Sequence, residues 1–227
     1  MNVEILKNQR EVYSGRFKKF GATPHGTFQN NTETQYLRFE RLLTPITPFL
    51  NDQSIHDIGS GLCDLHKYLV LKNFKHEYSG TEIVQEMIDY ALSQFTDIKL
   101  FNRDLLSAGP EEKYDYLVLS GTMNLLNNQD PAVWRDYCFQ LIRKMYDMSL
   151  KAISFNCLTS FNTFSDPSLY YFNPAEVFEF CVKNLSRFVI IDQGYPLFEF
   201  TCTVLKPEFL SEHYNSKLFS RYFNKKE

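Results

Sequence analysis

The residues best suited to chemistry in this chain follow an apolar run and surround two closely spaced glycines. Residues 54–65 read as a strand, a tight turn and the start of a helix, and the turn carries Asp57, Gly59, Ser60 and Gly61. Such a turn leaves backbone N–H groups unpaired at the helix start and lets a ligand approach the main chain. Asp64 stands where a dinucleotide fingerprint would have its third glycine, so the pattern is D-x-G-x-G-x-x-D.

Three further polar residues follow predicted strands, namely Glu82, Asp104 and Ser120. Open α/β sheets bind ligands at the carboxyl ends of their strands, and an acidic residue about 20 residues after the glycine turn can accept both ribose hydroxyl groups. Each residue alone has a structural interpretation: Glu82 as a solvated side chain, Asp104 as a helix cap and Ser120 as part of a turn. Together they predict a nucleoside site.

This succession over about residues 54–125 resembles the motifs of class I S-adenosyl-L-methionine (SAM)-dependent methyltransferases. The resemblance implies SAM as cofactor and S-adenosyl-L-homocysteine (SAH) as product. It implies that Glu82 and its neighbour Ile83 hold the ribose and that Asp104 and Leu105 address the adenine. The methionine part is expected against Gly59, Ser60 and Gly61, with Ser120 closing the other side. Leu62 and Cys63 are larger than the residues often found in the family's turn.

The elements that must position these residues alternate between strand and helix. Helical periodicity is predicted over 32–43, 83–95 and 133–145, and strands over 77–80, 98–101, 114–119 and 148–155. The strands at 187–192 and 198–204 are too close together to be parallel, so they predict a hairpin. We therefore expect a doubly wound, seven-stranded, mostly parallel Rossmann-like sheet with a C-terminal antiparallel hairpin.

The chain divides into three predicted parts. Residues 1–50 form a helical or lid segment, residues 51–206 form the SAM-binding domain with a substrate loop at 156–172, and residues 207–227 form a tail. Segments 13–28 and 159–172 combine aromatic residues with glycine, serine, asparagine and proline without a sustained period. We expect both to be mobile and to close over the bound ligands.

The same two segments supply most of the candidates for catalysis and acceptor binding. Methyl transfer is an in-line displacement that depends mainly on alignment, and His25 is the best candidate for a base, although an exposed loop histidine is the simpler interpretation. Tyr171 is the second catalytic candidate, and Arg38 is placed to pair the cofactor carboxylate. The candidates for contact with the acceptor are Tyr13, Phe20, Asn124, Phe161 and Tyr170.

Composition limits the remaining possibilities. The formal net charge is −3 and the five cysteines form no C-x-x-C pair, which indicates a cytoplasmic protein without a nucleic-acid footprint. No apolar run suits a membrane, and no histidine spacing suits a metal. We expect a monomer or homodimer that methylates an oxygen or nitrogen of a small-molecule acceptor. A SAM-binding regulatory module without catalysis and, with less support, a dinucleotide-dependent oxidoreductase stay open as alternatives.

Overall fold

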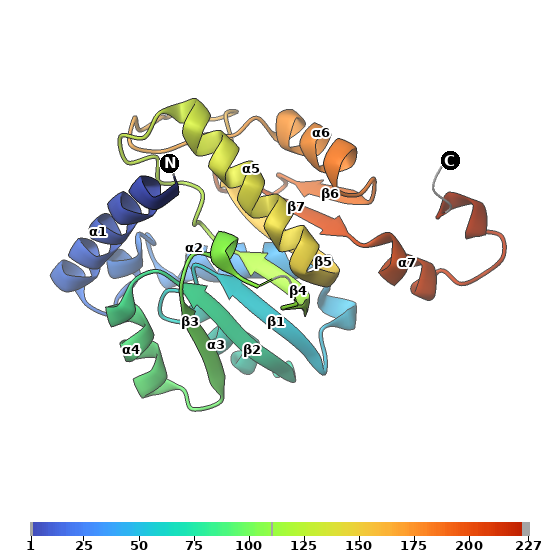
Figure 1. Ribbon diagram of the computed structural model, residues 1–227, viewed down its shortest axis with the longest axis horizontal. Coiled ribbons are helices and arrows are strands. Elements are labelled where there is room, and N and C mark those ends of the chain that lie inside the picture. The colour runs from blue at the N-terminus through green and yellow to red at the C-terminus, as the bar shows by residue number, and fades with distance from the viewer. Residues whose placement is uncertain (1, 110, 224–227) are drawn as a thin grey trace.

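A seven-stranded sheet with the order β3-β2-β1-β4-β5-β7-β6 organises the computed structural model, which describes residues 2–109 and 111–223 (Figure 1). All neighbouring strands are parallel except β7, which is antiparallel to both β5 and β6. The strands are β1 Gln53–Ile58, β2 His76–Glu82, β3 Ile98–Asn102, β4 Tyr114–Leu119, β5 Ser149–Leu158, β6 Val189–Asp192 and β7 Glu199–Leu205. The predicted fold class, including the closing hairpin, is confirmed.

Helices cover both faces of the sheet. The helices are α1 Asn2–Phe20, α2 Thr32–Leu43, α3 Asp64–Leu71, α4 Gln85–Gln94, α5 Pro131–Met148, α6 Pro174–Asn184 and α7 Pro207–His213. In β4, Leu117 and Leu119 point into the core beneath α5 and α6, whereas Tyr116 and Val118 point into the core beneath α2 and α3. This alternation explains why β4 is almost wholly apolar, because both of its faces are buried.

Local sequence signals set where several helices begin. The side chain of Asn31 caps α2 by accepting from the Thr34 N–H at 2.8 Å. Asp130 caps α5 by accepting from two backbone N–H groups, and a proline occupies the first helical position. Asn173 and Pro174 repeat this arrangement at the start of α6. These caps fix the residues at which the loops before α2, α5 and α6 end.

The N-terminal segment departs from its expected form. Residues 13–20, predicted as part of a mobile segment, lie in the 19-residue helix α1. Contacts far along the chain hold this helix: Arg10 Nε donates to the Ile83 carbonyl at 2.9 Å, and the Ser14 hydroxyl donates to Glu86 at 3.0 Å. A helix fixed by such tertiary contacts leaves only a weak periodic signal in the sequence.

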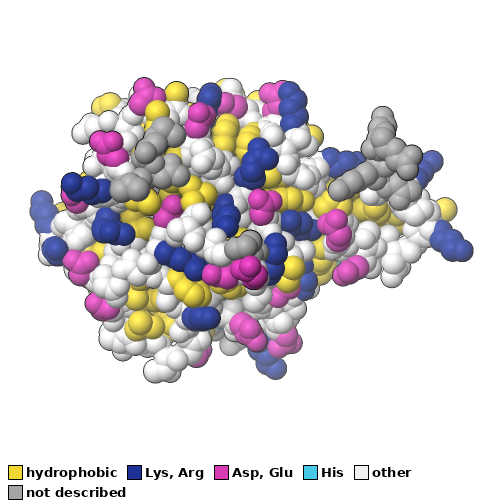
Figure 2. All heavy atoms as spheres, viewed as in Figure 1, with side chains coloured by type: hydrophobic (Ala, Val, Ile, Leu, Met, Phe, Trp, Pro, Cys, Tyr) yellow, Lys and Arg dark blue, Asp and Glu magenta, His cyan; other side chains and the backbone are white. Residues whose placement is uncertain are grey.

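Two further boundaries differ from the sequence expectation. Strand β5 extends to Leu158, three residues into the predicted substrate loop, because it pairs with β7 from Ala152 to Leu158. Helix α7 occupies part of the predicted tail and lies beside the main body (Figure 1). Figure 2 shows Lys and Arg side chains interspersed with Asp and Glu on the viewed face. Within the described residues, no helix is both long and apolar enough to cross a membrane.

Candidate active site

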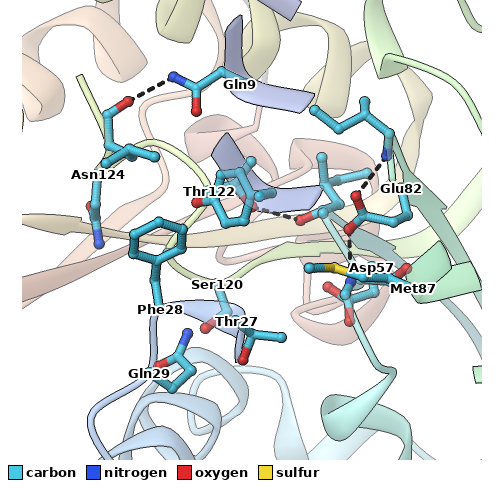
Figure 3. A pocket seen from close by; sticks show the side chains of 18 of the residues that line it. Gln9, Thr27, Phe28, Gln29, Asp57, Glu82, Met87, Ser120, Thr122 and Asn124 are labelled. Carbon is cyan, nitrogen blue, oxygen red and sulfur yellow. Dashed lines mark hydrogen bonds between the residues drawn. The ribbon is translucent and has the colours of Figure 1, made fainter. Parts of the chain in front are cut away.

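A cavity of about 540 Å³ opens at the carboxyl ends of β1, β2 and β4, beneath α1 and the 3₁₀ turn Pro24–Thr27 (Figure 3). Every residue predicted to bind the cofactor lines this cavity: Asp57, Gly59, Ser60, Gly61, Glu82, Ile83, Asp104, Leu105, Ser120 and Arg38. Tyr13 and Asn124, predicted to contact the acceptor, line it as well. The fold therefore brings together residues that are spread over much of the sequence.

The glycine turn after β1 has backbone geometry that favours glycine. Gly59 has φ +68°, and a Cβ atom placed on it would lie 2.3 Å from Thr122 Oγ1. That hydroxyl donates to the Ile58 carbonyl at 3.1 Å, so Thr122 packs tightly against the turn. Gly61 also has a positive φ, +52°, but its Cβ position is open apart from an ordinary contact with Thr27 at 3.7 Å. Steric constraint is therefore strongest at Gly59, and free space for a ligand is greatest at Gly61.

Glu82 closes the turn at the end of β2. Its Oε2 accepts from the Gly61 N–H at 2.9 Å, and its Oε1 accepts from the N–H groups of Ile83 and Val84 at 2.7 and 2.9 Å. Burial raises the pKa of this carboxyl group, and the three backbone hydrogen bonds oppose that rise. Since each carboxylate oxygen has two lone pairs, Oε2 retains capacity for a ligand hydroxyl group.

Two further carboxyl groups along the cavity are held by tyrosines. Asp57 accepts from the Tyr78 hydroxyl at 2.7 Å, and Asp104 accepts from the Tyr137 hydroxyl at 3.0 Å. Burial raises the pKa of Asp57 to about 7, with the charges of Glu82 and Asp64 adding to the effect. Burial also raises the pKa of Asp104. These groups give the cavity a negative, desolvated wall suited to a cationic ligand.

Several polar atoms in this region lack partners among the described residues. They are Gln9 Oε1, Ser60 Oγ, Ser120 Oγ and Arg103 Nε, all buried and all belonging to residues that line the cavity. A buried polar group without a hydrogen bond costs free energy unless a ligand or water satisfies it. Their gathering along one cavity, beside a glycine turn with free backbone space, fits a polar cofactor such as SAM.

Arg38 forms the centre of a buried network on the other side of the cavity. Its Nε and Nη2 donate to both oxygens of the Glu199 carboxylate at 2.6–2.9 Å, and its Nη1 donates to Gln29 Oε1 at 2.7 Å. Asn156 donates to Glu199 at 2.6 Å and accepts from the Gly121 N–H at 2.8 Å. The bidentate partner of Arg38 in the structure is thus Glu199, and its pairing with the cofactor carboxylate stays a prediction.

The remaining predicted residues lie away from the cavity lining. His25 is exposed, and its backbone carbonyl accepts from Arg16 Nε at 2.6 Å. The Tyr171 hydroxyl accepts from the Asp166 N–H at 2.8 Å, and Tyr170 packs edge-on against Phe172. Phe20 and Phe161 are exposed. The structure therefore gives no geometric support for a base role of His25 or Tyr171, or for acceptor contacts of Phe20, Phe161 and Tyr170.

Sequence reasoning missed three residues that line the cavity, namely Gln9, Gln29 and Glu199, and included a fourth, Phe28, only as part of the segment 13–28 expected to close over the ligands. Glu199 could have been recognised from the sequence as a candidate site residue, because it is a carboxylate within an otherwise apolar and threonine-rich strand. Nothing in the sequence distinguishes Gln9 and Gln29 as site residues, since uncharged amides are common on surfaces. Among the described residues, no group of three His, Cys, Asp or Glu side chains could hold a metal ion.

Comparisons with known proteins agree with this geometry. No known family profile matches the chain. The Mycobacterium tuberculosis protein named "Putative methyltransferase Rv1506c" is 31% identical over 169 residues, which span 73% of this chain and 98% of that protein.

Several solved structures share the fold. Magnesium protoporphyrin IX methyltransferase (ChlM) from Synechocystis PCC 6803 with bound SAH has a TM-score of 0.63 at 12% identity, covering 88% of this chain and 99% of that one. A DhpI–SAM–HEP complex has a TM-score of 0.63 at 14% identity, covering 89% and 97%. The N-methyltransferase NodS from Bradyrhizobium japonicum WM9 with SAH has a TM-score of 0.57 at 14% identity, covering 88% and 99%.

Proposed function

This chain belongs to the class I SAM-dependent methyltransferases, and from that premise we propose that it methylates an oxygen or nitrogen atom of a small-molecule acceptor. It is an enzyme, and SAM is its cofactor. The observation that carries the proposal is the continuous cavity. It extends from the carboxylates at the ends of β1–β3 to the amide-lined pocket formed by Gln29 and Asn124.

The residues at the strand ends fit the parts of SAM. In this proposal Glu82 accepts from the ribose hydroxyl groups, and Asp104 with Leu105 contacts the adenine. The turn Gly59–Gly61 and the unpartnered hydroxyl groups of Ser60 and Ser120 are suited to the methionine part. The negative wall formed by Asp57 and its neighbours complements a sulfonium cation.

Bound SAM supplies a methyl group that its sulfonium charge already activates for displacement. The chain's own contribution is to orient the acceptor and exclude water, which places the reacting atoms in line. Tyr13 and Phe28, whose rings meet edge-on at 5.0 Å, cover the cavity from the N-terminal segment. No histidine belongs to the described residues that line the cavity, so the proposal rests on alignment rather than on histidine base catalysis.

Turnover is tested by incubating the purified chain with methyl-labelled SAM and fractionated metabolite extract, then measuring SAH release and the labelled product. The proposal predicts label transfer to a small molecule that depends on Glu82. SAH binding without label transfer to any fraction would favour the regulatory module instead. A parallel incubation with Glu82→Gln separates specific transfer from background decomposition of SAM.

A further inference from the structure

Two side-chain amide nitrogens converge on the same empty space beside Gly121. A Cβ atom placed on Gly121 would lie 3.6 Å from Gln29 Nε2 and 4.0 Å from Asn124 Nδ2. Apart from Gly121 and its two chain neighbours, no other heavy atom of the described residues comes within 4 Å of it. Figure 3 shows the Gln29 amide near Ser120 and the Asn124 amide on the other side of the Phe28 ring. Both NH₂ groups therefore border the same space, where each is available to donate to an acceptor oxygen.

The orientation of each amide follows from its own oxygen. Gln29 Oε1 accepts from Arg38 Nη1 at 2.7 Å, and Asn124 Oδ1 accepts from the Leu158 N–H at 3.2 Å. Guanidinium and backbone N–H groups only donate, so the amide oxygens must face them. Both NH₂ groups are therefore directed away from these partners. No acceptor for either is found among the described residues.

The scaffold behind the amides is rigid and electrically neutral. The Arg38 guanidinium that holds Gln29 is paired with Glu199, and both side chains are buried. Asn156 connects Glu199 to the Gly121 N–H, so one network positions Gln29 and the Gly121 turn together. Phe28 adopts a left-handed backbone conformation with φ 59°, unusual for a bulky residue, immediately before Gln29.

The charges around the cavity select against an anionic ligand. Its three arginines each have a partner: Arg16 donates to the His25 carbonyl, Arg38 to Glu199, and Arg103 to Glu112 through both Nη atoms. Arg103 Nε has no partner among the described residues. Six carboxylates line the cavity: Asp57, Asp64, Glu82, Asp104, Asp166 and Glu199. A phosphate or carboxylate group of the acceptor, added to the cofactor's own carboxylate, would be desolvated among more negative than positive charges. A carbonyl or hydroxyl oxygen could accept from both amides without this penalty.

We infer that Gln29 and Asn124 determine acceptor specificity by binding an uncharged carbonyl or hydroxyl oxygen of the acceptor, whose apolar body lies against Phe28. This inference rests on the proposed methyltransferase function. It excludes phosphorylated acceptors and assigns the amide pair to the acceptor rather than to the carboxylate of the cofactor.

The test uses ¹⁵N-labelled, SAH-saturated protein and three ring compounds that differ in one group: benzamide, benzoate and phenyl phosphate. We expect benzamide to move the side-chain NH₂ signals of Gln29 and Asn124 and to bind at least tenfold more tightly than phenyl phosphate. Gln29→Glu and Asn124→Asp keep the oxygen that accepts from Arg38 or Leu158 and replace only the donor. Each should weaken benzamide binding at least tenfold while SAH affinity changes less than threefold. The exposed Gln94→Glu on α4 is the matched control.

Other outcomes would overturn the inference. If either variant weakens SAH binding tenfold, the amides serve the cofactor. If phenyl phosphate binds more tightly than benzamide, or no probe moves the two NH₂ signals while SAH binds, the assigned substrate class is wrong and the proposed function stands. Failure of the wild-type protein to bind SAH would instead overturn the proposed function itself.

Discussion

The two sides of the cavity are built in different ways. The side that we propose for the cofactor consists of short segments directly after β1, β2, β3 and β4, and a glycine turn and carboxylates mark it in the sequence. The side that we propose for the acceptor is assembled from distant parts of the chain: Arg38 and Glu199 are 161 positions apart, and Gln9 and Leu125 are 116 apart. A site at successive strand ends can be recognised locally, whereas a site assembled by tertiary contacts must be seen in three dimensions.

The largest expected effect is a loss of folding stability, and it should differ between the two glycines of the turn, Gly59 and Gly61. Gly59→Ala should lower the free energy of unfolding by about 2–5 kcal/mol, because a left-handed alanine costs about 1–2 kcal/mol and overpacking against Thr122 adds about 1–3. Gly61→Ala has the cost of a left-handed alanine but no overpacking, so its free energy of unfolding should fall by only about 1–2 kcal/mol. Urea unfolding of both variants measures the difference. Equal losses would show that Thr122 yields and that the turn is not sterically fixed.

The next effect concerns the carboxylate on the cofactor side. Glu82→Gln should weaken SAH binding by about 1.5–3 kcal/mol, the range for hydrogen bonds to a charged group. Glu77→Gln, an exposed change on the same strand, is the control and should bind SAH normally. Calorimetric titration gives both affinities. An unchanged affinity in a folded Glu82→Gln protein would remove Glu82 from the cofactor site.

The buried carboxyl group of Asp57 predicts a pH dependence of stability. Its pKa is raised to about 7 in the folded protein and has its ordinary value near 3.8 in the unfolded chain. The folded state therefore binds more protons between these values, so the free energy of unfolding falls as the pH rises toward and through 7.

Between pH 5 and 8, the wild type should lose at least about 1.4 kcal/mol more than Asp57→Asn, the equivalent of one pKa unit. Denaturant unfolding at each pH measures both proteins. Parallel stability curves would show that Asp57 ionises normally in the folded state and that the cofactor side is better solvated than its geometry indicates.

The smallest effect is expected for His25, which is exposed and lies just outside the cavity lining. His25→Ala should change SAH affinity and stability by less than about 0.5 kcal/mol, as is usual for exposed positions. Gln29, four residues later, lines the cavity. Once an acceptor is identified, turnover by His25→Ala should match the wild type. A large loss of turnover would return His25 to the catalytic role that its residue type suggests and would require the N-terminal segment to move.

The sequence predicted most of the sheet and the residues at the strand ends that line the cavity, because both depend on local patterns. It missed helix α1 because contacts with Ile83 and Glu86, far along the chain, hold that helix. Glu199, at the start of β7, is buried although it is a carboxylate, and the sequence analysis did not single it out. His25 was chosen from its residue type alone. The orientation of the Gln29 amide depends on its hydrogen bond with Arg38, and only the fold brings these two side chains together.

Calorimetric titration of the wild-type protein with SAH and with NAD tests the central claim, that the carboxyl end of the sheet binds SAM. The account predicts that SAH binds at one site per chain, with Glu82→Gln weakening it, and that NAD gives no heat of binding. At a hundredfold excess over its dissociation constant, SAH should also stabilise the fold by about 2.7 kcal/mol. Binding of NAD together with no binding of SAH would contradict the account.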